Sequence, residues 1–384
     1  MAKSVGGAPQ RAGVAVIGAG VVGAAVAYEL SSLGVDTLVL ESANGPASGA
    51  SGANSGIIHT GFDAGPGTFE TDMILAHGQR WRTVFDELAV PYSSCGAVML
   101  ALTFSDVTRL AGLAENAARN GIKVRQYDKG QLRHLEPFAR AQGGLLIPEE
   151  GITDPYETVE RLLHAAGAVH YGVAVRSVEP HEHGVIVHTP AGDVTARFAV
   201  NCAGLFADEI AADDSFSITP RRGEFAVFPQ DAAPLAGHIL LPLPQKETKG
   251  ILVFPTLHGF LCAGPTAVDQ SDKRSAKVDP EQLASVTRAA AKLLPRLADF
   301  RPVDSWAGLR TVGHPHNYIV EWSKRVPGLF HVAGIRSTGL SACLGLSAYV
   351  ADRLRERGLN TGARRSFAKP PPITPRPWWQ RRTA

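Results

Sequence analysis

Apolar residues follow two patterns along this chain of 384 residues, and the patterns predict two kinds of structure. Residues 14–17 are apolar at every position, which is typical of a strand buried on both faces of a parallel sheet. An apolar, Ala-rich helix at 21–33 and a second strand at 37–40 follow. The same arrangement returns near the end of the chain, where 329–333 predict a strand and 340–355 a long helix.

From residue 217 the pattern changes to short strands separated by turns, which is typical of an antiparallel sheet. These strands are predicted at 224–228, 239–241, 251–254, 260–263 and 318–321, with a flanking helix at 281–294. In the preceding region the pattern predicts helices at 66–88, 105–119, 128–136, from residue 155 and at 206–212. It also predicts strands at 96–102 and 198–204 and a hairpin of 173–178 with 185–189. Ser105, Asp128 and Asp154 are the expected N-caps. Glu157 and Glu160 are expected on a solvated helix face.

The turn after the first strand reads Gly18-Ala-Gly20-Val-Val-Gly23, which fits Gly-x-Gly-x-x-Gly. Gly18 permits a tight turn, Gly20 lets the backbone approach a pyrophosphate, and Gly23 lets helix and strand pack closely. The helix N-terminus faces the phosphates, and Glu41, which ends the second strand, can bind a ribose diol. The context predicts a dinucleotide site that also includes Val21, Val22 and Ser42. The alternative is a glycine-rich packing turn in another α/β protein.

Residues 44–61 form a run of small residues that cannot pack a core. Such a run permits close backbone approach to a flat or charged group, although a disordered linker has a similar composition. His59 closes this run, and both a structural role and a role at the cofactor or substrate remain open for it.

The composition is that of an ordinary α/β enzyme, with 45% hydrophobic and 19% charged residues. The net charge of +2 gives no reason to expect a nucleic-acid partner. Four widely spaced cysteines argue against a zinc site, an iron–sulfur cluster or a disulfide scaffold, so no metal is expected and a reducing cytoplasm fits. No apolar stretch reaches the roughly 20 residues of a membrane span.

The segment from residue 361 onward is rich in proline and basic residues and contains no acid. Proline excludes a helix or a central strand, so we expect a flexible or surface-draped tail. Alternatively, this tail makes a peripheral contact with an anionic membrane or a partner protein, with Trp378 and Trp379 as anchors.

Several blocks between residues 12 and 357 resemble the FAD-dependent oxidoreductases of the D-amino-acid-oxidase superfamily. They look most like the branch of glycerol-3-phosphate dehydrogenase and L-2-hydroxyglutarate dehydrogenase. The blocks lie at 48–61, 66–67, 201–208, 220–224, 249–250, 255–256, 264–266, 308–310 and 334–339. Arg336 and Thr338 depart from the acid and proline usual in this branch, and Asn317 stands where relatives often have Asp. These departures leave the substrate and the electron acceptor (quinone, oxygen or a protein) open.

The resemblance implies an FAD site rather than an NAD site, with the fingerprint glycines on the pyrophosphate and Glu41 on the adenosine ribose. It places Ala50, Ser51, Asn54 and Ser55 beside the diphosphate and flavin, and Val175 at the adenine. The remaining residues that it assigns to the cofactor are Ala203, Gly204, Gly334, Ser337, Thr338, Gly339 and Leu340. A helix N-terminus after Gly339 stabilises the negative charge of reduced flavin.

The expected fold is α/β, with a Rossmann-like FAD-binding domain built from discontinuous segments. This domain is assigned to 12–90, 145–215 and 326–360. A substrate domain of antiparallel sheet plus helices is assigned to 91–144 and 216–325. Residues 1–11 and 361–384 are expected to be flexible tails.

The implied reaction is hydride transfer from a small anionic hydroxy compound, a 2-hydroxy acid or glycerol 3-phosphate, to flavin N5. Arg310 would hold the substrate's anionic group, with a structural salt bridge as its alternative. Oxidation of an alcohol needs a base, for which His59 is the first candidate and His314 and His316 are the next. Arg222 and Lys249 would add positive potential. The rival predictions are an amino-acid or amine oxidase and an electron-transferring flavoprotein subunit.

Overall fold

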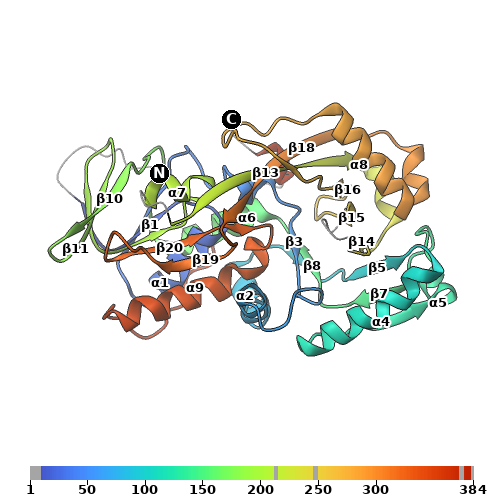
Figure 1. The fold of residues 1–384 in the computed structure, drawn as a ribbon, viewed down its shortest axis with the longest axis horizontal. Helices are drawn as coiled ribbons and strands as arrows, with labels where there is room; N and C mark the ends of the chain where they lie inside the picture. Colours follow the sequence, from blue (N-terminus) through green and yellow to red (C-terminus); the bar gives the residue numbers. More distant parts are fainter. Residues whose placement is uncertain (1–9, 212–214, 245–249, 372–375, 382–384) are drawn as a thin grey trace.

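The computed structural model describes residues 10–211, 215–244, 250–371 and 376–381 (Figure 1). Within these ranges the chain forms two joined parts, each built on a large sheet, an eight-stranded one at the left of Figure 1 and a ten-stranded one at the right. Lys249 lies outside the described residues, so its expected contribution to the site is not placed.

The eight-stranded sheet has a parallel centre drawn from distant parts of the chain. β1 lies between β2 and β12, and β20 continues the parallel arrangement beyond β12. The α/β fold expected from the sequence is therefore confirmed, with the first and last strands of the pattern in one sheet. Its strands are β1 (Gln10–Ile17), β2 (Thr37–Leu40), β9 (Ala168–His170), β10 (Ser177–His181), β11 (Gly184–His188), β12 (Val194–Asn201), β19 (Ile319–Trp322) and β20 (Leu329–Ala333).

Helices pack against this sheet and enclose its core. α1 is buried along almost its whole length because the sheet, α6 and α9 surround it, and its alanines allow close packing. In Figure 1, α1, α2 and α9 lie together below the sheet. The helices of this part are α1 (Val21–Ser32), α2 (Phe69–Gly78), α3 (Trp81–Leu88), α6 (Pro155–Ala166), α7 (Ala207–Ala211) and α9 (Gly339–Glu356).

The single helix predicted at 66–88 is wrong, because the segment forms the two helices α2 and α3. The first begins after Thr68, whose side chain accepts a hydrogen bond from the Thr71 N–H. It ends at Gly78, a residue of low helix propensity, and Arg80 then leaves helical geometry. The Arg80 guanidinium donates to Glu29 and to the Leu344 carbonyl, and so ties the break to α1 and α9.

The longest strands of the ten-stranded sheet are two antiparallel neighbours near its β21 edge, β13 (Ser217–Phe228) and β18 (Asp304–His314). These two strands cross the middle of the molecule in Figure 1 and pair in continuous register from Ser217 opposite His314 to Val227 opposite Asp304. The sheet is antiparallel as expected, apart from the parallel pair of β14 and β5. Its other strands are β5 (Ala97–Ala101), β6 (Arg125–Asp128), β7 (Gly143–Ile147), β14 (Ile239–Pro242), β15 (Leu252–Pro255), β16 (Leu261–Gly264), β17 (Val268–Asp269) and β21 (Ile335–Arg336).

Among the residues that the structure describes, three helices flank the second sheet: α4 (Phe104–Arg119), α5 (Lys129–Leu135) and α8 (Pro280–Leu293). The N-cap of α4 is Thr103 rather than the expected Ser105, because Thr103 forms a reciprocal capping box with Asp106. A small sheet of β3 (Ile57–Ile58), β4 (Tyr92–Ser93) and β8 (Gly151–Thr153) joins the two parts.

Two further expectations about local structure are wrong. The first strand of the hairpin, expected at 173–178, begins only at Ser177, so Val175 lies before β10 and not within it. Glu157 is buried at 7% exposure rather than solvated, because Arg161 and Arg381 pair with it. None of the helices in the described ranges is both long and apolar enough to span a bilayer.

The C-terminal tryptophans are not surface anchors. Trp378 is 1% exposed and Trp379 is 7% exposed, and both pack on Trp306 of β18. They therefore cannot insert into a membrane or a partner in this conformation. The role suggested for them by the basic tail is wrong for the part of the tail that the structure describes.

Candidate active site and cofactor site

The glycine turn between β1 and α1 leaves no room for side chains. Gly18 has a φ of +103°, and a Cβ there would lie 2.5 Å from the Cys202 carbonyl oxygen. A Cβ on Gly23 would lie 2.0 Å from the Gly18 oxygen. Gly20 is the N-cap of α1, so the first N–H groups of the helix open at the carboxyl edge of the sheet. This is the geometry that the fingerprint predicts for a pyrophosphate.

Glu41 lies beside this turn at the end of β2. Its Oε2 accepts a hydrogen bond from the Ala19 N–H at 2.7 Å, and its Oε1 accepts from the Ala43 N–H and the Ser42 hydroxyl. A carboxylate held next to a helix N-terminus suits the ribose of a dinucleotide. The Val173 N–H donates to the Glu41 carbonyl, so the segment leading to Val175 lies at the same edge.

The run of small residues is ordered here as a short 3₁₀ turn, η1 (Ala50–Ala53), with Asn54 and Ser55 after it. The Ser51 hydroxyl accepts a hydrogen bond from the Val21 N–H at 2.9 Å. The Asn54 amide donates to the Ser51 carbonyl and accepts from the Gly56 N–H. The linker alternative is thereby excluded, since this cofactor-facing loop (residues 50–55) is fixed directly against the N-terminus of α1.

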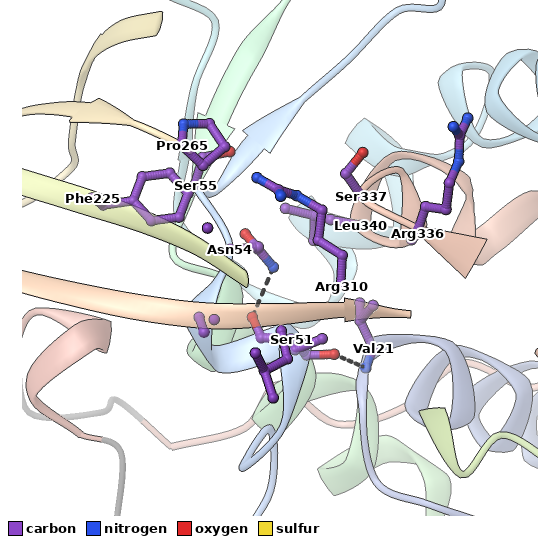
Figure 2. A pocket seen from close by; sticks show the side chains of 16 residues that line it. Val21, Ser51, Asn54, Ser55, Phe225, Pro265, Arg310, Arg336, Ser337 and Leu340 are labelled. Carbon is purple, nitrogen blue, oxygen red and sulfur yellow. Dashed lines mark hydrogen bonds between the residues drawn. The ribbon is translucent and has the colours of Figure 1, made fainter. Parts of the chain in front are cut away.

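A cleft with about 600 Å³ of empty space lies where the two parts of the molecule meet (Figure 2). Its walls come from four sources: the α1 turn with the cofactor-facing loop, the paired strands β13 and β18, Pro265 after β16, and the segment that leads into α9. The lining residues are Val21, Ala50, Ser51, Ala53, Asn54, Ser55, Gly223, Phe225, Pro265, Gly308, Leu309, Arg310, Arg336, Ser337, Gly339 and Leu340.

Part of the cofactor set proposed from the sequence lines this cleft. Val21, four residues of the small-residue loop, and Ser337, Gly339 and Leu340 line it directly. The others are outside the lining set: Gly18, Gly20, Val22, Gly23, Glu41, Ser42, Val175, Ala203, Gly204, Gly334 and Thr338. Ala203 lies at the fingerprint turn, 3.3 Å from the place of a Gly18 Cβ. The Thr338 hydroxyl is hydrogen-bonded to Glu70 and Tyr318.

Sequence patterns missed the lining residues Gly223, Gly308 and Phe225. Gly223 and Gly308 are directly opposite each other on β13 and β18. A Cβ on Gly308 would lie 2.6 Å from the Cβ of Ala53, so only glycine lets β18 reach the cofactor-facing loop. The pairing of these two glycines depends on the register of β13 and β18, which the separate sequence blocks do not reveal.

Arg310 extends from β18 into the cleft as a cation without an acidic partner. Its two terminal nitrogens donate to the Thr266 carbonyl, each at 3.0 Å, and among the described residues no carboxylate pairs with it. Its cross-strand neighbour Arg221 is neutralised by Asp269. Burial lowers the pKa of Arg310 to about 10, Arg221 adds to this, and Glu224 opposes it. The salt-bridge alternative for Arg310 is thus not supported.

His59 forms a pair with a buried glutamate that sequence reasoning did not identify. The His59 Nδ1 lies 3.0 Å from Oε2 of Glu150, whose side chain is fully buried. The other oxygen, Oε1, accepts from the Thr60 N–H and hydroxyl. The His59 N–H donates to Ser341, the residue after Leu340 of the cleft wall. Glu150 follows Glu149 in a turn between two apolar strands, where acids usually face solvent, so no sequence pattern marks it as a functional residue.

The other candidate bases and cations are placed less favourably. None of the three histidines is among the residues that line the cleft. His59 is joined to the cleft wall through Ser341, whereas His314, which contacts Thr219, and His316 are exposed. Arg222 lies 2.8 Å from the buried Glu224, so its charge is balanced. In Figure 2 the Arg336 side chain extends away from that of Arg310, and Arg336 donates to Glu70.

A parallel sheet with a glycine-rich helix N-terminus lies against an antiparallel sheet that supplies an arginine with no acidic partner among the described residues. This combination is that of a dinucleotide-dependent enzyme. The sequence model of the family "FAD dependent oxidoreductase" (DAO) matches residues 13–353. The chain belongs to this family. The glycine cradle, the α1 N-terminus and Glu41 supply the donors and the acceptor that FAD requires.

Two relatives of named activity fall in the branch that the sequence blocks indicated. The chain is 32% identical over 354 residues to a glycerol 3-phosphate dehydrogenase of Caloramator mitchellensis. The aligned part covers 89% of this chain and 73% of that protein. It is 28% identical over 266 residues to an L-2-hydroxyglutarate dehydrogenase of Escherichia coli O17:K52:H18, covering 66% of this chain and 63% of the relative.

Solved structures show the same fold. The L-alpha-glycerophosphate oxidase of Mycoplasma pneumoniae with FAD bound matches with a TM-score of 0.86 at 24% identity, covering 95% of this chain and all of that one. A glycine oxidase of Geobacillus kaustophilus matches with a TM-score of 0.81 at 23% identity, covering 90% and 95%. Since these identities are low, the two structures support the fold and leave the substrate to the site.

Proposed function

We propose that this FAD-dependent oxidoreductase oxidises a small anionic hydroxy compound, either a 2-hydroxy acid such as L-2-hydroxyglutarate or glycerol 3-phosphate. The observation that carries the proposal is Arg310, on the wall of a cleft bordered by the cofactor-facing loop, for which the described part of the chain supplies no acidic partner. Burying a charge without a counter-ion is unfavourable, so the arrangement is best explained by an anionic ligand. FAD, when bound, accepts the hydride.

Arg310 orients the substrate. Its terminal nitrogens both donate to the Thr266 carbonyl on one side, which fixes the plane of the guanidinium. The remaining N–H groups can bind two oxygens of a carboxylate or phosphate side by side. A substrate held in this way keeps one C–H bond in a fixed position, which is the main requirement for hydride transfer.

His59 takes the hydroxyl proton. Glu150 accepts from Nδ1, so the proton of the neutral imidazole is held there and Nε2 carries the lone pair. Nε2 has no hydrogen-bond partner among the described residues. Glu150 also stabilises the imidazolium that forms when the hydroxyl proton is taken. An alcohol needs such a base, whereas an amine substrate can lose its proton to water before binding. The pair therefore favours a hydroxy compound over an amine.

The test is anaerobic reduction of the purified holoprotein. The loss of its flavin absorbance measures the reduction. Glycerol 3-phosphate, L-2-hydroxyglutarate, L-lactate, glycine and L-proline are added separately. Bleaching by a hydroxy compound supports the proposal and selects the substrate class. Bleaching only by the amino acids would assign the chain to amine oxidation. If none of the five reduces a flavin that dithionite still reduces, the proposal is wrong and an electron-transferring role becomes the better explanation.

A further inference from the structure

The C-terminal segment 377–381 lies against the wall of the cleft. Trp379 stacks on Trp306 with ring centroids 5.2 Å apart and planes 8° apart. Trp306 stacks in turn on Phe225 at 4.6 Å and 9°, and Phe225 lines the cleft. Trp378 meets Trp379 and Trp306 edge-on. A continuous aromatic stack therefore connects the end of the chain to the cleft.

Two indoles from this stack hold two consecutive carbonyls of the cofactor-facing loop. The Trp306 Nε1–H donates to the Ala53 oxygen, and the Trp378 Nε1–H donates to the Asn54 oxygen, each at 3.1 Å. An indole N–H can only donate, so both contacts are directional. Trp306 belongs to β18, whereas Trp378 comes from the C-terminal segment, 324 positions away from Asn54.

Polar contacts on its outer side fix the position of Trp378. The Trp379 indole and the Gln380 amide both donate to Asp304, the first residue of β18. Arg381 pairs with Glu157 of α6 at 3.2 Å, with both side chains 9% exposed, and its guanidinium lies over the ring of Tyr156. The segment is thus held to β18 and α6 at once.

The contact at Asn54 continues through hydrogen bonds to the dinucleotide turn. The Asn54 side chain donates to the Ser51 carbonyl, and the Ser51 hydroxyl accepts from the Val21 N–H, as the dashed lines in Figure 2 show. The loop between these points contains only Ala, Ser, Gly and Asn. Such a loop has no large side chain to anchor it, and small residues have much backbone entropy to lose on ordering. Its conformation therefore depends on external contacts.

We propose that residues 377–381 form an intramolecular clasp that holds the cofactor-facing loop in its FAD-binding conformation, with Trp378 as the positioning residue. When the clasp is weakened, the free protein populates loop conformations that cannot bind FAD. The apparent FAD affinity then falls in proportion to the fraction of protein that still has the FAD-binding conformation. The effect arises before any substrate is present.

The test compares Trp378→Phe with the wild type by FAD titration of the apoprotein and by amide hydrogen exchange of residues 52–56. Phe keeps an aromatic ring but removes the hydrogen bond to Asn54, so we expect about fivefold weaker FAD binding and faster exchange in the loop. Trp379→Phe removes only the bond to Asp304, and its effect is expected to be smaller. Trp322→Phe on β19 is the matched control, because Trp322 packs on Phe198 and Phe330 rather than on the loop.

Unchanged affinity and unchanged loop exchange in Trp378→Phe would overturn the clasp. So would an equal loss in Trp322→Phe, which would mark a general destabilisation. If Trp378→Phe does not accumulate as folded protein, Arg381→Met gives the same test. This substitution removes the ion pair that holds the segment to α6 but keeps the Trp378 side chain, and it is expected to weaken FAD binding in the same direction. Neither readout depends on the substrate, so failure of the clasp and failure of the proposed reaction are distinguishable.

Discussion

Glu150→Gln tests the proposed base most directly, because the structure decides how the new amide must lie. One oxygen of Glu150 accepts from both the Thr60 N–H and the Thr60 hydroxyl, and the other faces His59 alone. The amide oxygen of Gln will keep the two donors of Thr60. Its NH₂ group then faces Nδ1 of His59 and donates to it.

The amide forces His59 into the wrong tautomer. Nδ1 becomes an acceptor, so the ring proton moves to Nε2, the nitrogen that must take the hydroxyl proton. To act as a base, His59 has to give up the new hydrogen bond and place two N–H groups opposite each other, a difference of about two hydrogen bonds. At ~1.5 kcal/mol each this is ~3 kcal/mol, or about a hundredfold in kcat.

Steady-state kinetics with the substrate found by flavin bleaching will measure the effect. We expect kcat to fall about a hundredfold and KM to change little, because Arg310 still holds the anion. Glu149→Gln is the control, since Glu149 is exposed in the same turn. Thermal unfolding of both variants should stay close to the wild type. A Glu150→Gln enzyme that keeps most of its kcat would refute the assignment of His59 as the base.

Three further predictions follow from the site. Arg310→Met should raise KM and lower kcat/KM by about two to three orders of magnitude, with Arg310→Lys recovering part of the loss; equal activity of both variants with the wild type would exclude Arg310 from substrate binding. Because burial lowers the pKa of Arg310 to about 10, its charge is lost as pH rises through that value, so the Ki of an anionic competitive inhibitor should increase between pH 9 and 10.5; a flat profile to pH 11 would contradict this. Gly23→Ala should give protein without flavin, since the new Cβ would lie 2.0 Å from the Gly18 oxygen. The control Gly112→Ala, in open space on α4, should bind FAD normally, and absorbance at the flavin bands measures both results.

The sequence determined those parts of the protein that depend on neighbouring residues. The apolar run, the glycine turn, the helix and Glu41 follow one another within about thirty residues, and the physics that joins them is local. The caps at Asp128 and Asp154 were predictable for the same reason. The separate sequence blocks also sufficed for the family and the α/β fold, since each block carries its own short-range signal.

Tertiary structure decided the contacts between residues distant in sequence. Glu150 reaches His59 across 91 positions, and Trp378 reaches Asn54 across 324. Gly223 meets Gly308 only through the register of β13 and β18. The lack of an ion-pair partner for Arg310 among the described residues is likewise a property of the folded arrangement. So is the burial of Trp378 and Trp379 in a tail whose other described residues are mostly exposed. Composition and periodicity describe what one residue prefers, whereas pairing, burial and charge balance depend on which partners the fold brings within a few ångströms.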